Sequence, residues 1–231
     1  MGTTSRGAPD FAPRGDDLYR YARWGLWALP VWAVLLAVST LSHQPSYSTD
    51  FPAYAEYVTT TRFLISHLVA SILGAAIGVL GMIALFVHLT GEGRSRLALW
   101  GLVTSVVGNI LTASVFGVAA FAQPAIGRAY LAGDTERAVA INSDVYGVPL
   151  FATALPGLLL FAIGIVLFGA AVARSGRFPR MAGIGFALGG VLFAIIGFLF
   201  GAVQPVGGAV MIISTAWISQ SAGRMGDGGT L

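Results

Sequence analysis

The stretch Phe63–Gly91, FLISHLVASILGAAIGVLGMIALFVHLTG, decides the fold because its 29 residues include no Asp, Glu, Lys or Arg. A bilayer core roughly 30 Å thick is crossed by about 20 apolar residues in a helix, so this stretch is long enough to span a membrane. The chain of 231 residues is 56% hydrophobic and only 10% charged, whereas a soluble domain is about one quarter charged. Four further stretches free of those charged residues meet the same length: Trp24–Thr49, Leu97–Gly127, Val145–Ala173 and Met181–Gly223. The sequence therefore predicts a polytopic membrane protein.

The last of these stretches is too long for one helix. Its 43 residues would extend about 65 Å, about twice the hydrocarbon thickness. In its middle, Gly201-Ala-Val-Gln-Pro205 supplies a helix breaker and predicts a tight hairpin. We therefore expect an all-α bundle of six transmembrane helices without a soluble domain. We expect these helices at 22–42, 63–89, 97–121, 148–172, 181–202 and 205–220. They are flanked by a disordered polar tail at 1–21 and a second tail at 221–231.

The arginines are distributed unevenly between the connections. All 13 basic residues are arginine, and with six spans only Arg62, Arg128 and Arg137 fall on one side of the membrane. Basic residues favour the cytoplasmic side, so we expect both termini in the cytoplasm. The arginine-only, Ala- and Gly-rich composition suits a GC-rich bacterial genome and predicts a bacterial cytoplasmic membrane. The other ten arginines share the predicted cytoplasmic side: Arg6, Arg14, Arg20, Arg23, Arg94, Arg96, Arg174, Arg177, Arg180 and Arg224.

Three of the four glutamines precede a proline: Gln44-Pro45, Gln123-Pro124 and Gln204-Pro205, spaced by 79 and 81 residues. In the predicted topology each pair lies at the outer end of an odd-numbered helix. One interpretation is descent from a repeated helical hairpin. The other is that each proline stops a helix while the glutamine amide binds the last carbonyls of that helix. The sequence leaves both open.

His67 is the main candidate site residue. It lies one to two turns inside the outer end of the second predicted helix, on the same face as Ser71, so we expect it to point into the bundle. An ionisable side chain inside a membrane is costly and marks a functional site by default. The competing interpretation is a neutral histidine that is hydrogen-bonded to a neighbouring carbonyl or hydroxyl. At the same outer boundary we expect Glu56, Arg62 and Asp144, which complete the candidate ligand-binding set.

Asn109 is the only amide near the middle of a predicted span. It would either bind a ligand or form a hydrogen bond that fixes the register of two helices. Together with Thr104, Thr112 and Thr153 it offers weak hydrogen bonds, which suit a small and mostly neutral solute. The predicted helix interiors hold no carboxylate for a proton-coupled pump and no filter-like sequence for an ion channel.

Most catalytic and metal-binding patterns are missing from the sequence. There is no cysteine, which excludes disulfides, thiolate ligands and cysteine nucleophiles. No His, Asp or Glu pair stands at helical spacing inside a predicted span, and three histidines are too few for two bis-histidine haems, so we expect no metal and no cofactor. Serine catalysis with His67 as the base stays open because Ser66 and Ser71 are near in sequence, although no oxyanion-binding motif accompanies them. We lean toward a protein that is not an enzyme.

The passage Ser175-Gly-Arg-Phe-Pro179-Arg-Met-Ala-Gly183 resembles the basic S-x-x-x-P-R-x-x-G connection between late helices in uncharacterised bacterial multi-pass membrane protein families. The resemblance covers part of the chain and includes the Gly133-Asp134 element before the fourth helix. It implies an integral membrane location in a six-helix protein of unassigned function. No functional residue transfers from it.

The sequence therefore predicts an integral membrane protein that binds or passes a small neutral solute or a lipid through an outward-facing pocket near His67. Two alternatives stay open: an intramembrane enzyme acting on a lipid-like substrate at the outer boundary, and a structural partner of another membrane protein. The expected partners are membrane lipids, with other membrane proteins or a second copy of the chain as further candidates. Nucleic acid is not expected, because the arginines are scattered between apolar runs.

Overall fold

A computed structural model describes residues 15–41, 44–91 and 93–227 of the chain, and every regular element in these ranges is a helix. Six helical segments are long and apolar enough to cross a membrane, which confirms the predicted all-α fold with six spans. Most of the predicted N-terminal tail, and also His43, lie outside the described residues. The six segments are Leu18–Ser39, Thr61–Thr90, Arg96–Leu131, Val148–Arg174, Arg180–Leu199 and Gly201–Arg224.

Several spans are built from more than one helical element. The first span comprises α1 (Gly15–Gly25) and α2 (Ala28–Ser39). The second span comprises α4 (Thr61–Ile65), the π-helix η1 (Ser66–Leu73) and α5 (Gly74–Thr90). The third span is α6 (Arg96–Leu131) and the fourth is α8 (Val148–Arg174). The fifth span comprises α9 (Arg180–Val191), the π-helix η2 (Leu192–Ile196) and α10 (Gly197–Leu199). The sixth span comprises the 3-10 turn η3 (Gly201–Val203) and α11 (Gln204–Asp227). Within the described ranges, α3 (Phe51–Val58) and α7 (Thr135–Val145) are the helices that lie outside the spans.

The third span differs most from its expected length. The sequence predicts that it ends near residue 121, but α6 continues through Pro124 to Leu131. A proline inside a helix removes one backbone hydrogen bond. Gln123 and Pro124 are buried where α3 and α7 pack against α6, and this packing offsets the loss. A helix of 36 residues is about 54 Å long, so its end extends well beyond a bilayer core of about 30 Å.

A glycine ends α6 and fixes the direction of α7. Gly133 has a φ of +97°, a conformation that favours glycine, and donates its N–H to the Tyr130 carbonyl at 3.0 Å. The Asp134 N–H reaches the Ala129 carbonyl at 3.1 Å, which completes a Schellman motif. The chain then reverses into α7 beside the end of α6. α7 begins at Thr135, directly after this turn.

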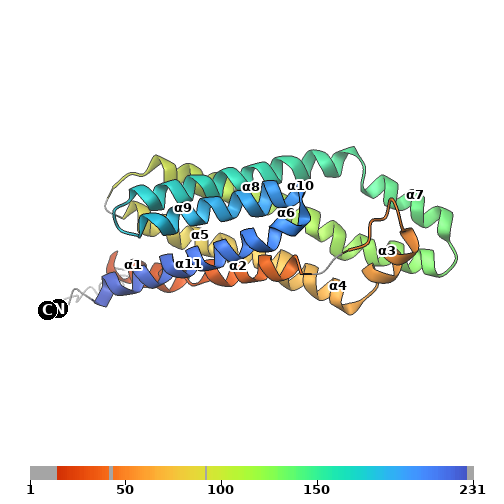
Figure 1. Ribbon diagram of the computed structural model, residues 1–231, viewed down its shortest axis with the longest axis horizontal. Coiled ribbons are helices and arrows are strands. Elements are labelled where there is room, and N and C mark those ends of the chain that lie inside the picture. The colour runs from red at the N-terminus through yellow and green to blue at the C-terminus, as the bar shows by residue number, and fades with distance from the viewer. Residues whose placement is uncertain (1–14, 42–43, 92, 228–231) are drawn as a thin grey trace, which may run out of the picture.

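The two ends of the bundle differ in composition. Figure 1 shows α3 and α7 at one end, while α1, the last turns of α11 and the α8–α9 connection lie at the other. We call the first end the cap, which comprises α3, α7 and residues 118–131 of α6. The opposite end, called the arginine-rich end, holds the described members of the larger arginine group: Arg20, Arg23, Arg94, Arg96, Arg174, Arg177, Arg180 and Arg224.

Small residues allow α6 and α8 to pack closely. A Cβ atom at Gly108 of α6 would overlap the backbone of Phe161, and one at Gly164 of α8 would overlap the Ser105 hydroxyl. Lipid gives helices no hydrophobic reason to associate, so close backbone contact is what holds such a pair together. The two helices form the most extensive pair in the bundle.

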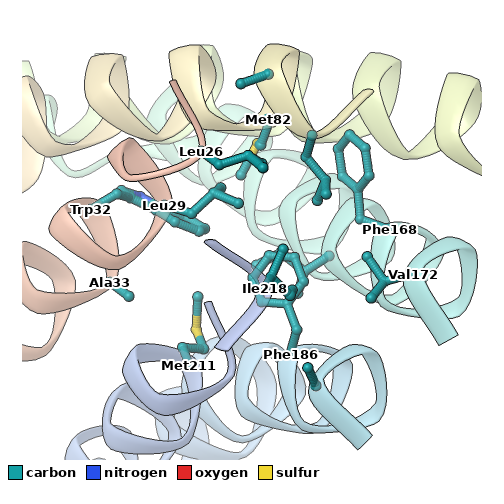
Figure 2. Close-up of a cluster of buried hydrophobic side chains, with 14 of the residues drawn as sticks. Leu26, Leu29, Trp32, Ala33, Met82, Phe168, Val172, Phe186, Met211 and Ile218 are labelled. Carbon is teal, nitrogen blue, oxygen red and sulfur yellow. The ribbon is translucent and has the colours of Figure 1, made fainter. Parts of the chain in front are cut away.

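The apolar core fills the half of the bundle nearer the arginine-rich end. Figure 2 shows side chains from several spans meeting there, with Trp32 of α2 beside Leu29, and Met82 and Phe186 on the facing helices. The Trp32 ring is fully buried and meets the Phe161 and Phe186 rings edge-on, at centroid distances of 5.8 and 6.5 Å. The bundle is therefore solid in this half.

Candidate functional site

The other half of the bundle, nearer the cap, is hollow. A cavity of about 500 Å³, which we call the central cavity, is lined by residues from all six spans. Its apolar wall includes Trp32 and Phe161, which form its floor on top of the core. Among the described residues, no Asp, Glu, Lys or Arg lines it. Its polar wall consists of Ser39, Thr40, Gln44, Ser66, His67, Ser71, Asn109, Thr112 and Gln204.

His67 lines the central cavity from the second span. Its Nδ1 lies 3.0 Å from the carbonyl oxygen of Phe63, one turn earlier, and its ring stacks on the Phe63 ring at a centroid distance of 4.1 Å. A carbonyl oxygen only accepts, so the neutral ring carries its proton on Nδ1 and leaves Nε2 as an acceptor. No described residue forms a hydrogen bond with Nε2. His67 therefore combines both sequence interpretations: it is bonded to a carbonyl and still available to a ligand.

Two π-helical segments border the central cavity. His67 and Ser71 belong to η1, whereas Phe193 and Ala194 belong to η2. Short π-helical turns widen a helix locally and occur frequently at functional sites. Segments of this kind therefore line the cavity from two different spans.

Asn109 contributes an amide from deep in α6. The side chain is only 3% exposed, and its Nδ2 donates to the Ser105 carbonyl at 2.8 Å and contacts Met82 Sδ at 3.8 Å. The bond to Ser105 lies within one helix, and the contact to Met82 crosses to α5. No described residue donates to Oδ1, so this oxygen is the part of Asn109 that a ligand in the cavity can reach.

The mouth of the central cavity carries the Gln-Pro pairs. Gln44 and Gln204 both line the cavity, and Gln44 Nε2 donates to Gln123 Oε1 at 3.3 Å. Gln123 in turn donates to the Tyr146 hydroxyl. The interpretation in which proline stops each helix is wrong for two pairs, since Pro124 lies inside α6 and Pro205 lies in the first turn of α11. Two of the three glutamines therefore line the cavity, and the third, Gln123, contacts one of them.

The cap is a second, smaller core of aromatic residues. Tyr54 of α3 is fully buried, and its hydroxyl donates to Asn142 Oδ1 on α7 at 3.1 Å. Burial raises the pKa of Tyr54 well above its ordinary value, with the neighbouring Tyr146 and Tyr47 adding to the shift. The hydroxyl therefore stays neutral and keeps its proton for Asn142. This bond joins α3 to α7.

One phenylalanine connects the cap to the cavity. Phe63 is fully buried, lies 5.7 Å from the Tyr57 ring of α3, and stacks on His67. The 5.7 Å between the Phe63 and Tyr57 centroids lies in the range of about 4.5–7 Å in which aromatic rings attract, and the Phe63 and His67 centroids are closer, at 4.1 Å. The position of the cap is thus coupled by direct contact to the ring that faces the cavity.

The structure brings together two of the five candidate residues and separates the other three. His67 and Asn109 line the central cavity. Glu56, Arg62 and Asp144 are exposed and are not part of its wall. Sequence proximity to His67 placed Glu56 and Arg62 in the candidate set, but α3 and α4 direct both side chains outward. No carboxylate from this set accompanies His67 in the cavity.

Sequence reasoning missed the glutamines of the cavity wall, although a signal for them existed. The Gln-Pro spacing pointed to Gln44 and Gln204, but only the packing of spans that are far apart in the chain places both in one cavity wall. In the described ranges, no three His, Cys, Asp or Glu side chains lie close enough to hold a metal ion.

The chain matches no model of a known protein family, no curated protein and no solved structure. The resemblance of the Ser175–Gly183 connection therefore does not assign the chain to a family. With six spans around a closed core, the chain is a multi-pass α-helical membrane protein.

Proposed function

We infer that the protein binds a small, uncharged and largely apolar molecule, bearing one or two hydrogen-bonding groups, in the central cavity. The observation that carries this proposal is the composition of the wall: aromatic and aliphatic side chains from the first five spans, several uncharged polar groups and, among the described residues, no charged side chain. Cavities of about 300–1,000 Å³ with a few polar groups in an apolar wall are typical of small-molecule sites. A volume of about 500 Å³ falls in this range.

The polar groups of the wall limit the chemistry of the ligand. A buried charge without a counter-charge is very costly, so a wall without ionised side chains favours a neutral ligand. His67 Nε2 and Asn109 Oδ1 accept hydrogen bonds, and the amide of Gln204 at the mouth can donate or accept. A hydroxyl or amide on an otherwise apolar molecule, including a lipid-like one, fits this set.

The floor of the cavity favours binding over open passage. Trp32 and Phe161 separate the hollow from the arginine-rich end, and the solid core lies beneath them. A ligand enters in this conformation from the side of the cap. Under the positive-inside rule this side is the outer face of a bacterial cytoplasmic membrane. Passage to the other face would require the floor to open.

A cavity-filling substitution tests the proposal. We expect the neutral apolar fluorophore 1-aminoanthracene to bind saturably to the purified full chain. Ala154→Phe, which adds a ring to the cavity wall on α8, should weaken this binding by about tenfold or more, because the ring takes up space in the cavity. Ala152→Phe is the matched control, since Ala152 is exposed on the same helix and outside the central cavity.

Equal saturable binding by the wild type, Ala154→Phe and Ala152→Phe would place the fluorophore on the lipid-facing surface and contradict the proposal. Loss of fluorophore binding in both variants would indicate damage to α8 and not occupation of the cavity. The thermal midpoint of each variant distinguishes such damage from a filled cavity.

A further inference from the structure

A second, smaller cavity lies at the opposite end of the bundle. It has a volume of about 310 Å³ and opens between the α5–α6 connection and the end of α8. Arg94, Arg174 and Arg177 line it, and no Asp or Glu among the described residues does. We call it the basic pocket. Glu92, in the same connection as Arg94, lies outside the described residues.

The three guanidinium groups are held in different ways. Arg177 is half-buried and donates from Nη1 to the His88 carbonyl at 2.5 Å, which anchors the α8–α9 connection to the end of α5. Arg94 and Arg174 are exposed, and no described side chain forms an ion pair with either of them. Planar guanidinium groups bind phosphate oxygens through paired hydrogen bonds, so the exposed groups of Arg94 and Arg174 suit a phosphate group.

The start of α6 adds to the positive potential of the basic pocket. Ser95 lines the pocket and caps α6, its Oγ accepting from the Ala98 N–H at 3.2 Å. The N-terminus of a helix carries a partial positive charge and free N–H groups, which favour anions. The partial positive charge at the start of α6 therefore adds to the positive charge of the three arginines.

The other side of the basic pocket is apolar. Leu89, Leu97 and Ala171, from three different spans, line it on the side of the bundle interior. Trp100, one turn further along α6, is 58% exposed, as expected for an aromatic side chain at the level of the lipid headgroups. The pocket thus combines a basic side with an apolar side, close to an exposed aromatic residue of α6.

We propose that the basic pocket binds the phosphate of an anionic phospholipid. Basic pockets between transmembrane helices on the cytoplasmic side bind the headgroups of such lipids. A zwitterionic lipid brings its own ammonium group into a pocket that already holds three arginines, so the pocket selects against it. The apolar side of the pocket and the lipid-facing surface at Trp100 accommodate the acyl chains, which a free phosphate ion lacks.

Native mass spectrometry of the full chain in a nonionic detergent tests this inference with dioleoyl phosphatidylglycerol, dioleoyl phosphatidylcholine and inorganic phosphate as probes. We expect one phosphatidylglycerol to bind at least about tenfold more tightly than phosphatidylcholine. The double substitution R94Q/R174Q should weaken phosphatidylglycerol binding by about tenfold, because each arginine near a headgroup contributes separately.

The matched control is R128Q/R137Q, which removes the same charge from exposed positions at the cap end and should leave the affinity unchanged. Millimolar inorganic phosphate should not displace the lipid. Equal binding of the two lipids, equal loss in both double variants, or displacement by phosphate alone would each overturn the inference. Arg94 and Arg174 have no ion-pair partner among the described residues, so R94Q/R174Q should keep the wild-type thermal midpoint.

Discussion

Replacing Trp32 by alanine should lower the thermal midpoint of the protein more than any other substitution discussed above. The ring is fully buried, meets Phe161 and Phe186 edge-on, and lies against Gly78, where a Cβ atom would be 2.8 Å from it. Replacing a buried tryptophan by alanine costs about 3–5 kcal/mol, through lost contacts and the cavity that remains. The measurement is helix content by circular dichroism during heating, at one scan rate in one detergent.

Trp100→Ala is the control for this prediction, because Trp100 is 58% exposed and has only lipid to contact on its outer side. Its midpoint should stay close to that of the wild type. Equal losses at the two positions would mean that the core of Figure 2 does not hold the bundle together. Since Trp32 also forms the floor of the central cavity, Trp32→Ala should deepen the cavity toward the arginine-rich end.

High pH should destabilise the protein through the cap. Burial raises the pKa of Tyr54 in the folded chain above the ordinary tyrosine value of about 10, so the folded state holds this proton more tightly than the unfolded state. The stability that the neutral hydroxyl contributes is fully present below pH 10. It is lost as the pH rises from about 10 toward the folded-state pKa, at about 1.4 kcal/mol for each pH unit.

Denaturation of the wild type and of Tyr54→Phe between pH 8 and pH 12 tests this expectation. The variant should be less stable at pH 8 by about 1–3 kcal/mol, because Asn142 Oδ1 loses its buried donor. Its stability should then fall less steeply above pH 10, with Tyr146, whose pKa burial also raises, accounting for the remaining slope. Parallel slopes for the two proteins would show that Tyr54 is not buried as a neutral group. Tyr21→Phe, at an exposed position on α1, controls for the loss of a hydroxyl.

The six spans could be predicted from the sequence because lipid imposes a simple rule on length and charge. The rule follows from the hydrocarbon thickness, so it predicts nothing about the part of a helix that lies beyond the membrane. This is why the continuation of α6 through Pro124 was missed: the cost of the proline is local, whereas the packing of α3 and α7 that offsets it is tertiary.

The candidate site was predictable only in part, for a similar reason. Polar residues inside a span are rare and expensive, so His67 and Asn109 could be identified from position alone. The glutamines at the mouth lie at the ends of spans, where polar residues are common, and only the packing of distant segments brings Gln44 to Gln123. The π-helical turns of η1 and η2 have no breaker or motif that distinguishes them in sequence.

The most direct test of the central cavity uses the absence of cysteine from the chain, which makes any introduced thiol unique. Thr112 lines the cavity, and Ser105, two turns earlier on α6, is fully buried against α8. Methyl methanethiosulfonate, which is small and neutral, should modify Thr112→Cys at least about tenfold faster than Ser105→Cys, and Ala154→Phe should abolish the difference. Equal, slow modification of both thiols, or a rate at Thr112→Cys that Ala154→Phe leaves unchanged, would contradict a hollow that small uncharged molecules can enter.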